Sequence, residues 1–308
     1  MIRNVCLLGG TGFVGTHLAS RLAERGCRVT IPSRHPQRHR VLSVLPTVQL
    51  VRADVHDEAT LAQLLRGCDA VINLVGVLND TRRASFRRVH VELPRKVAQA
   101  ARAAGVRRLL HMGALCADAA NAPSAYLRTR GEGEAALRVH AADRVAYTVF
   151  HPSVIFGPGD SFLNRFHALL RLAPVFPLAC PDARFQPVFV GDVVDAFVRA
   201  LDDRATHGRR YSLCGPRVYT LRELVEYAAE TAGLDRRIVG LPRWLGFLQA
   251  ALLEWAPGRP FTRDNWRSLQ VDSVCDGPGG LAQLGLESTP LELVAPRYLG
   301  RAASAAAL

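Results

Sequence analysis

The sequence has little lysine: Lys96 is the only one among 39 lysine and arginine residues, so 39 − 1 = 38 are arginine. It lacks a signal peptide and an apolar run long enough to span a membrane, which predicts a cytoplasmic protein. It also lacks zinc-finger spacing, a basic tail and any recognised nucleic-acid module, and this disfavours nucleic acid as a partner. Because arginine is so abundant, a single arginine in place of a lysine is weak evidence of altered chemistry.

The chain is long enough for one large or two small domains with a substantial core, since it has 308 residues. Hydrophobic residues make up 49% and charged residues 21%, which excludes a disordered chain. The formal net charge of +12 favours anionic partners such as nucleotides or acidic lipid surfaces. We expect the arginine pairs at solvated helix ends and loops: Arg82-Arg83, Arg87-Arg88, Arg107-Arg108, Arg209-Arg210 and Arg236-Arg237.

The seven cysteines show no pairing pattern, because their number is odd and no two are near neighbours. Most lie in apolar runs. Reduced, buried thiols are therefore expected, and neither a disulfide framework nor a metal site is predicted. The residues are Cys6, Cys27, Cys68, Cys116, Cys180, Cys214 and Cys275.

Short apolar segments alternate with amphipathic ones over the first two-thirds of the chain, which predicts a parallel sheet with helices on both faces. The expected strands are Val5–Leu8, Arg28–Ile31, Val48–Val51, Ala70–Leu74, Arg108–Met112 and Ala146–Phe150. The expected helices are Phe13–Arg25, Thr60–Arg66, Phe86–Ala104 and Tyr126–Val139. A further strand, helix and strand at Gln186–Val190, Asp192–Leu201 and Arg210–Leu213 return the chain to the sheet edge. We expect an α/β fold: a Rossmann-type doubly wound sheet over residues 1–215, and a mainly helical lobe from residues 216–308 and an insertion near 162–182.

A glycine turn follows the first expected strand, with the spacing G-x-x-G-x-x-G over Gly9, Gly12 and Gly15. This is a variant of the dinucleotide fingerprint: the glycines permit a tight turn, a close approach of the backbone to a pyrophosphate and close helix packing. The helix N-terminus then offers free N–H groups and a positive dipole end. The predicted cofactor contacts here are Gly9, Thr11, Gly12, Phe13, Val14 and Gly15.

Arg34 follows the second expected strand, where an acidic residue would bind the ribose hydroxyls of NAD(H). An arginine suits a 2′-phosphate instead, so we expect NADP(H) to be preferred over NAD(H), with Ser33 and Arg38 as helpers. The alternative is an ordinary surface arginine in an arginine-rich chain. Further cofactor contacts are expected beyond the ends of the other strands, at Asp54, Val55, Leu74, Val75, Gly76, Pro152 and Val154.

With these motifs the chain resembles the short-chain dehydrogenase/reductase superfamily, in its extended and atypical branches. The matching segments are Gly9–Gly15, Asp54–Val55, Asn73–Gly76, Tyr126 with Arg130, His151–Gly159 and Val188–Val194. Through Ser124–Glu134 and Arg263–Asp272 it is most similar to the group containing the nucleotide-binding accessory subunit (alpha-subcomplex subunit nine) of respiratory complex I and its bacterial relatives. The resemblance implies tight NADPH binding and partners among membrane-associated respiratory or quinone-biosynthesis proteins.

The resemblance also implies a catalytic serine, tyrosine and lysine. Tyr126 is present, and Arg130 stands four residues later on the same helical face in the place of the lysine. Gly113 aligns with the serine and has no side-chain donor; losing such a donor reduces turnover by about 10²–10³-fold. We therefore expect a cofactor-binding protein with weak or absent dehydrogenase activity and a structural, assembly or redox-sensing role. An active NADP-dependent oxidoreductase or epimerase that uses Tyr126 and Arg130 is the first alternative.

Weaker candidates lie beside the same strand ends. His111 and His151 are expected either as acid–base groups or as packed side chains, and Asp192 as a helix cap. All three tryptophans fall between Trp244 and Trp266, and apolar residues there recur at helical spacing between flanking arginines. This pattern suits a helix at the inner face of an acidic cytoplasmic membrane, or on a hydrophobic partner, in a peripheral membrane or scaffold protein. Alternatively, the helix closes the small lobe over the cleft.

Overall fold

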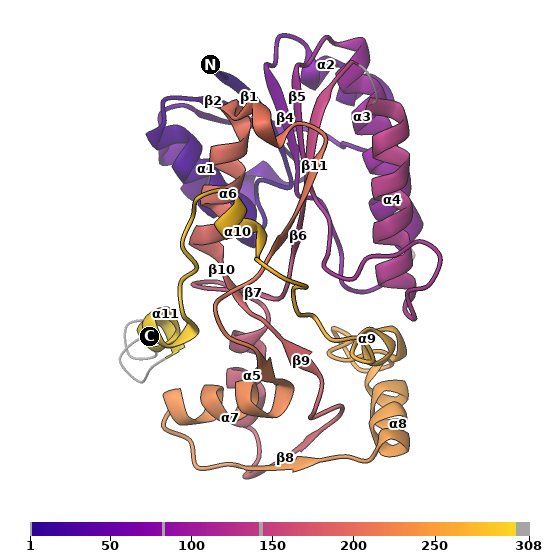
Figure 1. The fold of residues 1–308 in the computed structure, drawn as a ribbon, viewed down its shortest axis with the longest axis vertical. Coiled ribbons are helices and arrows are strands. Elements are labelled where there is room, and N and C mark those ends of the chain that lie inside the picture. The colour runs from indigo at the N-terminus through magenta and orange to yellow at the C-terminus, as the bar shows by residue number, and fades with distance from the viewer. Residues whose placement is uncertain (1, 82–83, 142–143, 300–308) are drawn as a thin grey trace.

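A seven-stranded parallel sheet forms the centre of the computed structural model, which describes residues 2–81, 84–141 and 144–299 (Figure 1). The strand order is β11-β6-β5-β4-β1-β2-β3, so the order reverses between β1 and β4 as in a doubly wound sheet. The expected fold class is confirmed, and all six expected strands of the first domain, with the returning edge strand, belong to this sheet. Their bounds are β1 (Asn4–Leu8), β2 (Arg28–Ser33), β3 (Val48–Arg52), β4 (Ala70–Asn73), β5 (Arg108–Met112), β6 (Ala146–Pro152) and β11 (Arg209–Leu213).

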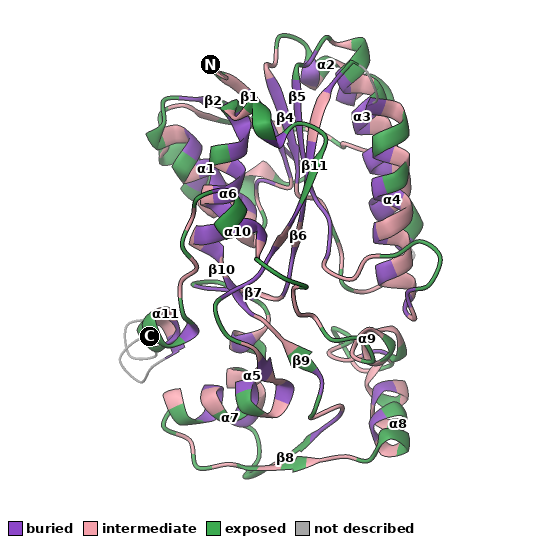
Figure 2. Ribbon diagram, in the orientation of Figure 1, coloured by how far each residue is buried: buried purple, intermediate pink, exposed green. Residues whose placement is uncertain are grey.

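Helices cover both faces of the sheet because its central strands are apolar on both sides; every residue of β4 and β5 is buried (Figure 2). On one face, α1 and α6 pack through Leu18, Leu22 and Phe197. On the other, α2, α3 and α4 pack through Leu61, Val97 and Leu137. These helices are α1 (Phe13–Glu24), α2 (Glu58–Leu65), α3 (Leu93–Ala103), α4 (Ala125–Ala141) and α6 (Val190–Asp202).

The helix expected over Phe86–Ala104 begins differently from the prediction. A π-helical segment, η2 (Arg87–Glu92), precedes α3. Pro94 stands in the first turn of α3 and lacks the N–H that would continue an α-helical bond to the turn before it. Short 3-10 segments, η1 (Pro36–Val44) and η3 (Arg204–Thr206), complete the large domain.

A smaller lobe lies beyond the carboxyl edge of the sheet, in the lower half of Figure 1. Its two apolar clusters combine residues from both sides of position 215, such as Leu163 with Leu224 and Leu170 with Val225. The helix that begins at Gly280 packs against β11 of the large sheet. The domain boundary at residue 215 stays a prediction. The elements are β7 (Ile155–Phe156), α5 (Leu163–Leu170), β8 (Val175–Leu178), β9 (Arg184–Phe185), β10 (Val188–Phe189), β12 (Tyr219–Thr220), α7 (Leu221–Thr231), β13 (Arg237–Gly240), α8 (Arg243–Leu253), α9 (Arg263–Ser268), α10 (Gly280–Gln283) and α11 (Leu291–Leu299).

The expectation that all cysteines are reduced is wrong for one pair. Cys214 and Cys275 form a disulfide with a Cα–Cα distance of 6.2 Å. The chain brings Cys275 back to the end of β11 after 61 residues, a separation that gives no signal in the sequence. Cys68, Cys116 and Cys180 are free but only partly buried.

Several charged residues also differ from their predicted places. Arg108 is buried rather than solvated, and its guanidinium donates to the carbonyl of Ala200 and the hydroxyls of Thr148 and Thr206. Burial lowers the pKa of Arg108 to about 10. Asp192 does not cap α6, because it lies inside the first turn and accepts hydrogen bonds from the N–H and hydroxyl of Thr289. Of the other predicted pairs, Arg209 and Arg210 lie within β11 and Arg237 lies within β13, so these residues are in strands and not in loops. Arg82 and Arg83 lie outside the described residues.

Candidate functional site

The glycine turn between β1 and α1 has the geometry that its spacing predicts. Gly9 has φ of +79°, a left-handed conformation that favours glycine, and its carbonyl accepts a hydrogen bond from Gly12 N at 3.0 Å. A Cβ added to Gly15 would lie 2.6 Å from Gly10 Cα, so only glycine lets α1 start this close to the turn. Gly10 was given no role from the sequence, yet a Cβ there would lie 2.8 Å from the side chain of Ile31.

The start of α1 is suited to an anion. Gly12 caps the helix without a side chain, and the first turn contains no acidic residue. The backbone N–H groups at the start of a helix have no partner within the helix and carry its positive dipole end. Thr11, Phe13 and Val14 therefore stand where a pyrophosphate would be bound by backbone groups.

The remaining predicted cofactor residues lie at the carboxyl edge of the sheet. Ser33 ends β2 and is buried, while Arg34 directly after it and Arg38 in η1 are exposed. Gly9 packs against the chain after β4: a Cβ there would lie 3.1 Å from Val75 N. Leu74, Val75 and Gly76 follow β4, Asp54 and Val55 follow β3, and Pro152 ends β6, with Val154 two residues on.

Tyr126 and Arg130 lie one turn apart on α4, as predicted, and they are in contact. The guanidinium carbon of Arg130 is 5.5 Å from the centre of the Tyr126 ring. Arg130 is buried, and it donates one hydrogen bond of 3.0 Å to the carbonyl of Met112 at the end of β5. It also packs on Gly76, where an added Cβ would lie 2.9 Å from its guanidinium carbon. The structure thus brings β4, β5 and α4 together around one buried cation.

Gly113 follows β5, and the imidazole of His151 fills the space that a side chain would take there. A Cβ on Gly113 would lie 2.5 Å from Cδ2 and 3.1 Å from Nε2 of His151. His151 Nε2 is 2.6 Å from Glu134 Oε2, and Arg210 pairs with the other oxygen of that carboxylate. Burial raises the pKa of Glu134, but its hydrogen bond with His151 and the charges of His151 and Arg210 outweigh burial and hold that pKa below its ordinary value.

Two further histidines, His90 and His111, lie close enough to Arg130 to feel its charge. His111 is 1% exposed and 3.3 Å from the side-chain nitrogen of Asn73, which favours the packed interpretation over an acid–base role. Burial, and then the charge of Arg130, lowers the pKa of His111 to about 3. The same causes lower the pKa of His90 to about 2, and its ring meets the Tyr126 ring edge-on at 5.4 Å. Both imidazoles are therefore neutral near pH 7.

A residue of the small lobe anchors the helix that carries Tyr126. The carboxylate of Asp264, on α9, accepts hydrogen bonds from Ala125 N at 2.7 Å and from Tyr126 N at 3.0 Å. A carboxylate at this position satisfies the first N–H groups of α4 and its dipole. Asp264 belongs to the segment Arg263–Asp272 that carried the family resemblance, which was the only signal of its importance.

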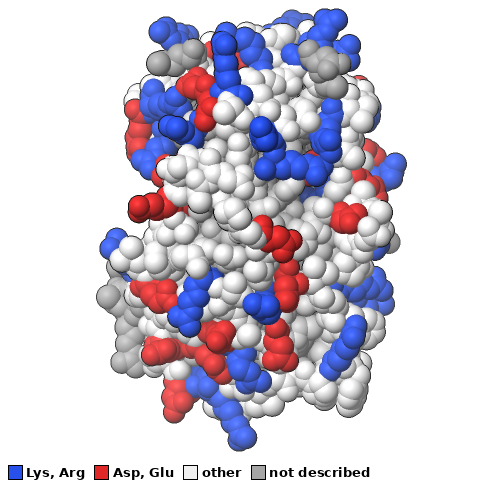
Figure 3. All heavy atoms as spheres, viewed as in Figure 1, with Lys and Arg blue, Asp and Glu red and all other residues white. Residues whose placement is uncertain are grey.

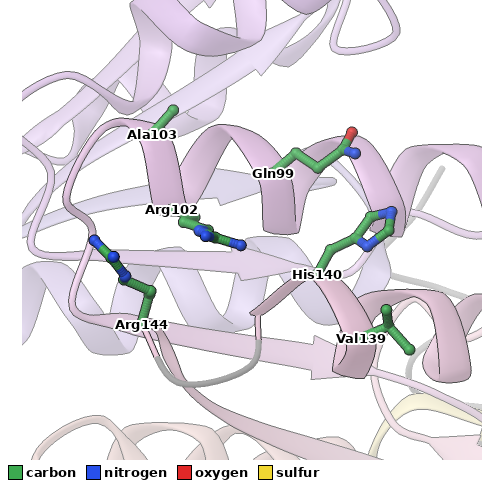
Figure 4. A pocket seen from close by; sticks show the side chains of 6 residues that line it. All are labelled: Gln99, Arg102, Ala103, Val139, His140 and Arg144. Carbon is green, nitrogen blue, oxygen red and sulfur yellow. The ribbon is translucent and has the colours of Figure 1, made fainter.

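A surface cavity of about 380 Å³ lies elsewhere, between the carboxyl ends of α3 and α4 (Figure 4). Carboxyl ends of the crossover helices face the amino edge of a parallel sheet, opposite to the glycine turn. Five of its six lining residues are exposed, so it is a shallow basin and not a second candidate site. They are Gln99, Arg102, Ala103, Val139, His140 and Arg144.

Comparison with known proteins gives a family match over residues 5–214, to the NAD dependent epimerase/dehydratase family. The chain is 31% identical over 307 residues to the mitochondrial NADH dehydrogenase (ubiquinone) 1 alpha subcomplex subunit 9 of Mus musculus, covering 96% of this chain and 79% of that protein. It is also 31% identical over 240 residues to a ceramide reductase of Caulobacter vibrioides, covering 77% and 73%.

A solved structure shares the whole fold at low identity. The enzyme WbmH of Bordetella bronchiseptica, crystallised with NAD⁺, superposes with a TM-score of 0.73 at 20% identity and covers 98% of both chains. At this identity the likeness concerns the fold alone. The 98% coverage extends the likeness over both the large domain and the small lobe.

Proposed function

Because the chain belongs to the NAD dependent epimerase/dehydratase family, we propose that it binds NADP(H) along the carboxyl edge of its sheet and transfers hydride weakly or not at all. The observation that carries this proposal is an intact phosphate turn beside a serine position where Gly113 faces the ring of His151. The turn keeps every glycine that the cofactor requires, whereas position 113, after β5, lacks the hydroxyl that would bind a substrate oxygen.

The residues present fit such a cofactor. Arg130 Nε is buried and has no hydrogen-bond partner among the described residues, and a ribose hydroxyl would satisfy it. A Cβ on Gly12 would lie 3.3 Å from Gly9 O, so a side chain would crowd the turn that a pyrophosphate approaches. When bound, the cofactor supplies or accepts a hydride.

Each part of the cofactor has its own residues in the proposal. Backbone N–H groups of Gly12 to Gly15 bind the pyrophosphate, and Arg34 binds the 2′-phosphate with help from Ser33 and Arg38. Asp54 and Val55 meet the adenine. The chain after β4, the end of β6 and the α4 pair face the nicotinamide ribose: Leu74, Val75, Gly76, Pro152, Val154, Tyr126 and Arg130.

Calorimetric titration with NADPH and with NADH tests this proposal. We expect NADPH to bind more tightly, and Arg34→Ala to weaken NADPH by about 10–100-fold while leaving NADH nearly unchanged, since one charge-assisted hydrogen bond contributes about 1.5–3 kcal/mol. Arg28→Ala, at the opposite end of β2, is the matched control and should change neither. Equal affinities that Arg34→Ala does not alter would show that the 2′-phosphate is not recognised.

A second candidate function is an active NADP-dependent oxidoreductase or epimerase. It is favoured by the 5.5 Å separation of the Arg130 guanidinium carbon from the Tyr126 ring centre, which places a cation beside the phenol that would transfer a proton. A turnover detected with a panel of carbonyl and quinone substrates, and abolished in Tyr126→Phe, would establish this function in place of the first.

The names of two relatives support a proposal about where in metabolism this chain acts. The mouse relative is named as a subunit of NADH dehydrogenase (ubiquinone), and this supports a structural, assembly or redox-sensing role beside respiratory complex I or in quinone metabolism. The Caulobacter relative is named as a reductase of a lipid, ceramide. For this chain we propose a cytoplasmic location at the inner face of a membrane.

A further inference from the structure

The outer face of α8 exposes large apolar side chains that no other part of the described chain covers. Trp244 is 68% exposed, Leu252 66% and Trp255, just past the end of the helix, 86%. With Leu248 these residues recur every three or four positions, which places them on one side of the helix. We propose that this face, the α8 face (Trp244, Leu248, Leu252 and Trp255), docks on the surface of an anionic lipid bilayer.

The opposite side of α8 already provides the contacts that hold the helix in the fold. Gly246 and Ala250 are buried, and a Cβ on Gly246 would lie 3.1 Å from Ala179 Cβ. Phe247 meets the ring of Trp266 edge-on at 5.2 Å. Gln249 donates a hydrogen bond of 2.9 Å to the carbonyl of Pro177. The packing of the small lobe therefore does not require the α8 face. The expectation that this helix closes the small lobe accounts only for the inner side of the helix.

Charge around the α8 face matches anionic headgroups. Residues 243–267, all of which the structure describes, contain four arginines and two acidic residues, a balance of 4 − 2 = +2. The acidic residues are engaged: Glu254 pairs with Arg263 at 2.7 Å, and Asp264 caps α4. In Figure 3 the lower right of the molecule, where Figure 1 places α8, is white and blue, whereas the red side chains of the lower half lie in its middle and at its left.

A bilayer explains the composition of the α8 face better than a protein partner does. Tryptophans stand near both ends of the face, and tryptophan prefers the boundary between headgroups and acyl chains, where its ring is buried and its N–H stays wet. Arginines beside them can reach the phosphates. Among the described residues no helix combines the length and apolar character needed to cross a bilayer, so α8 would lie on the surface.

The docked helix would sit next to the candidate site. Trp266 of α9 packs against α8, and Asp264 of the same helix holds the N-terminus of α4. Asn265 of α9 donates to the carbonyl of Leu78, which follows β4 and is 53% exposed. A single helix, α9, thus separates the helix that carries Tyr126 from the proposed membrane contact. Docking would bring a membrane-dissolved molecule close to Tyr126 and Arg130.

Vesicle binding of the full chain tests the proposal, with phosphatidylcholine vesicles compared against vesicles that also contain phosphatidylglycerol. The intrinsic fluorescence reports the contact directly, because all three tryptophans lie in or beside α8. We expect flotation and a blue shift only with the anionic vesicles. Trp244→Ala and Trp255→Ala should each weaken partitioning on the order of tenfold, and Arg267→Glu by about tenfold.

Matched controls are Leu172→Ala, an exposed leucine of the small lobe outside α8, and Arg102→Glu on α3, and both should bind as the native chain does. Absence of anionic-vesicle binding, or binding that the α8 variants leave unchanged, would overturn the proposal. So would a self-associated chain that Trp255→Ala dissociates, because a second copy would then cover the face. NADPH titration of the same variants should be unaffected, so failure here is separable from failure of the proposed cofactor function.

Discussion

Restoring the missing serine hydroxyl, with Gly113→Ser, should not restore hydride transfer. The structure predicts instead that the variant is destabilised, because the new Cβ would lie 2.5 Å from Cδ2 of His151. That ring cannot retreat freely, since its Nε2 is 2.6 Å from Glu134 Oε2 and the two side chains are only 15% and 5% exposed. The position of the His151 ring thus requires glycine at position 113.

The size of the effect follows from two costs. Overpacking a filled site costs about 1–3 kcal/mol, and losing a hydrogen bond to a buried charged group costs about 1.5–3 kcal/mol. Partial relaxation of the His151 ring avoids some of each, so we expect the free energy of unfolding to fall by about 2–4 kcal/mol. Urea denaturation followed by circular dichroism measures it.

Two variants make the test specific. Gly279→Ser is the matched control, because nothing lies within 4 Å of a Cβ added there, and it should leave stability unchanged. Adding His151→Ala to Gly113→Ser removes the clashing ring, so the two changes together should cost less than the sum of their separate costs. A Gly113→Ser protein as stable as the native chain, with carbonyl reduction gained, would refute both the filled-site argument and the proposed loss of catalysis.

Three further changes test other parts of the structure. Asp264→Ala should lower the free energy of unfolding by about 1 kcal/mol by uncapping α4, with Asp264→Asn closer to the native chain; thermal unfolding of the two variants checks this. Arg108→Met leaves several buried acceptors unpaired and should cost about 2–4 kcal/mol in urea denaturation, an effect that a native-like midpoint would exclude. His90 and His111 are neutral in the fold, with pKa values of about 2 and about 3, but bind protons near pH 6.5 when unfolded. Stability should therefore fall as the pH drops below about 6, and His111→Gln should reduce that slope by about 1.4 kcal/mol per pH unit.

Most of the large domain could be predicted from sequence because its signals are local. The β5 strand has its predicted bounds, Arg108–Met112, since an apolar run flanked by turns fixes it. The glycine turn from Gly9 to Gly15 was likewise predictable, because a tight turn before a helix demands glycine at set spacing. The resemblance to the short-chain dehydrogenase/reductase superfamily and to the complex I subunit is confirmed by the relatives.

Long-range contacts could not be read from the chain. The disulfide of Cys214 joins residues 61 positions apart, and Asp264 reaches the start of α4 from 139 residues away. The burial of Arg108 depends on acceptors from α6 and the turn after it, which no local pattern places around β5. These features arise from tertiary packing, which the periodicity and the residue spacing of the sequence do not reveal.

The phosphate turn and the catalytic positions also differ in how well the sequence predicts them. The turn works through backbone groups that its own sequence positions, so the sequence predicts it well. The serine position depends on a histidine from the next strand, and only the structure brings His151 against Gly113. The assignments of cofactor contacts to single residues stay predictions until a bound complex is measured.

Native mass spectrometry of the protein as purified, before and after addition of NADPH, shows whether the chain binds this cofactor. We expect one NADP(H) per chain, either retained from the cell or taken up on addition, in preference to NAD(H). A chain that stays at the mass of the bare polypeptide in excess NADPH would contradict it.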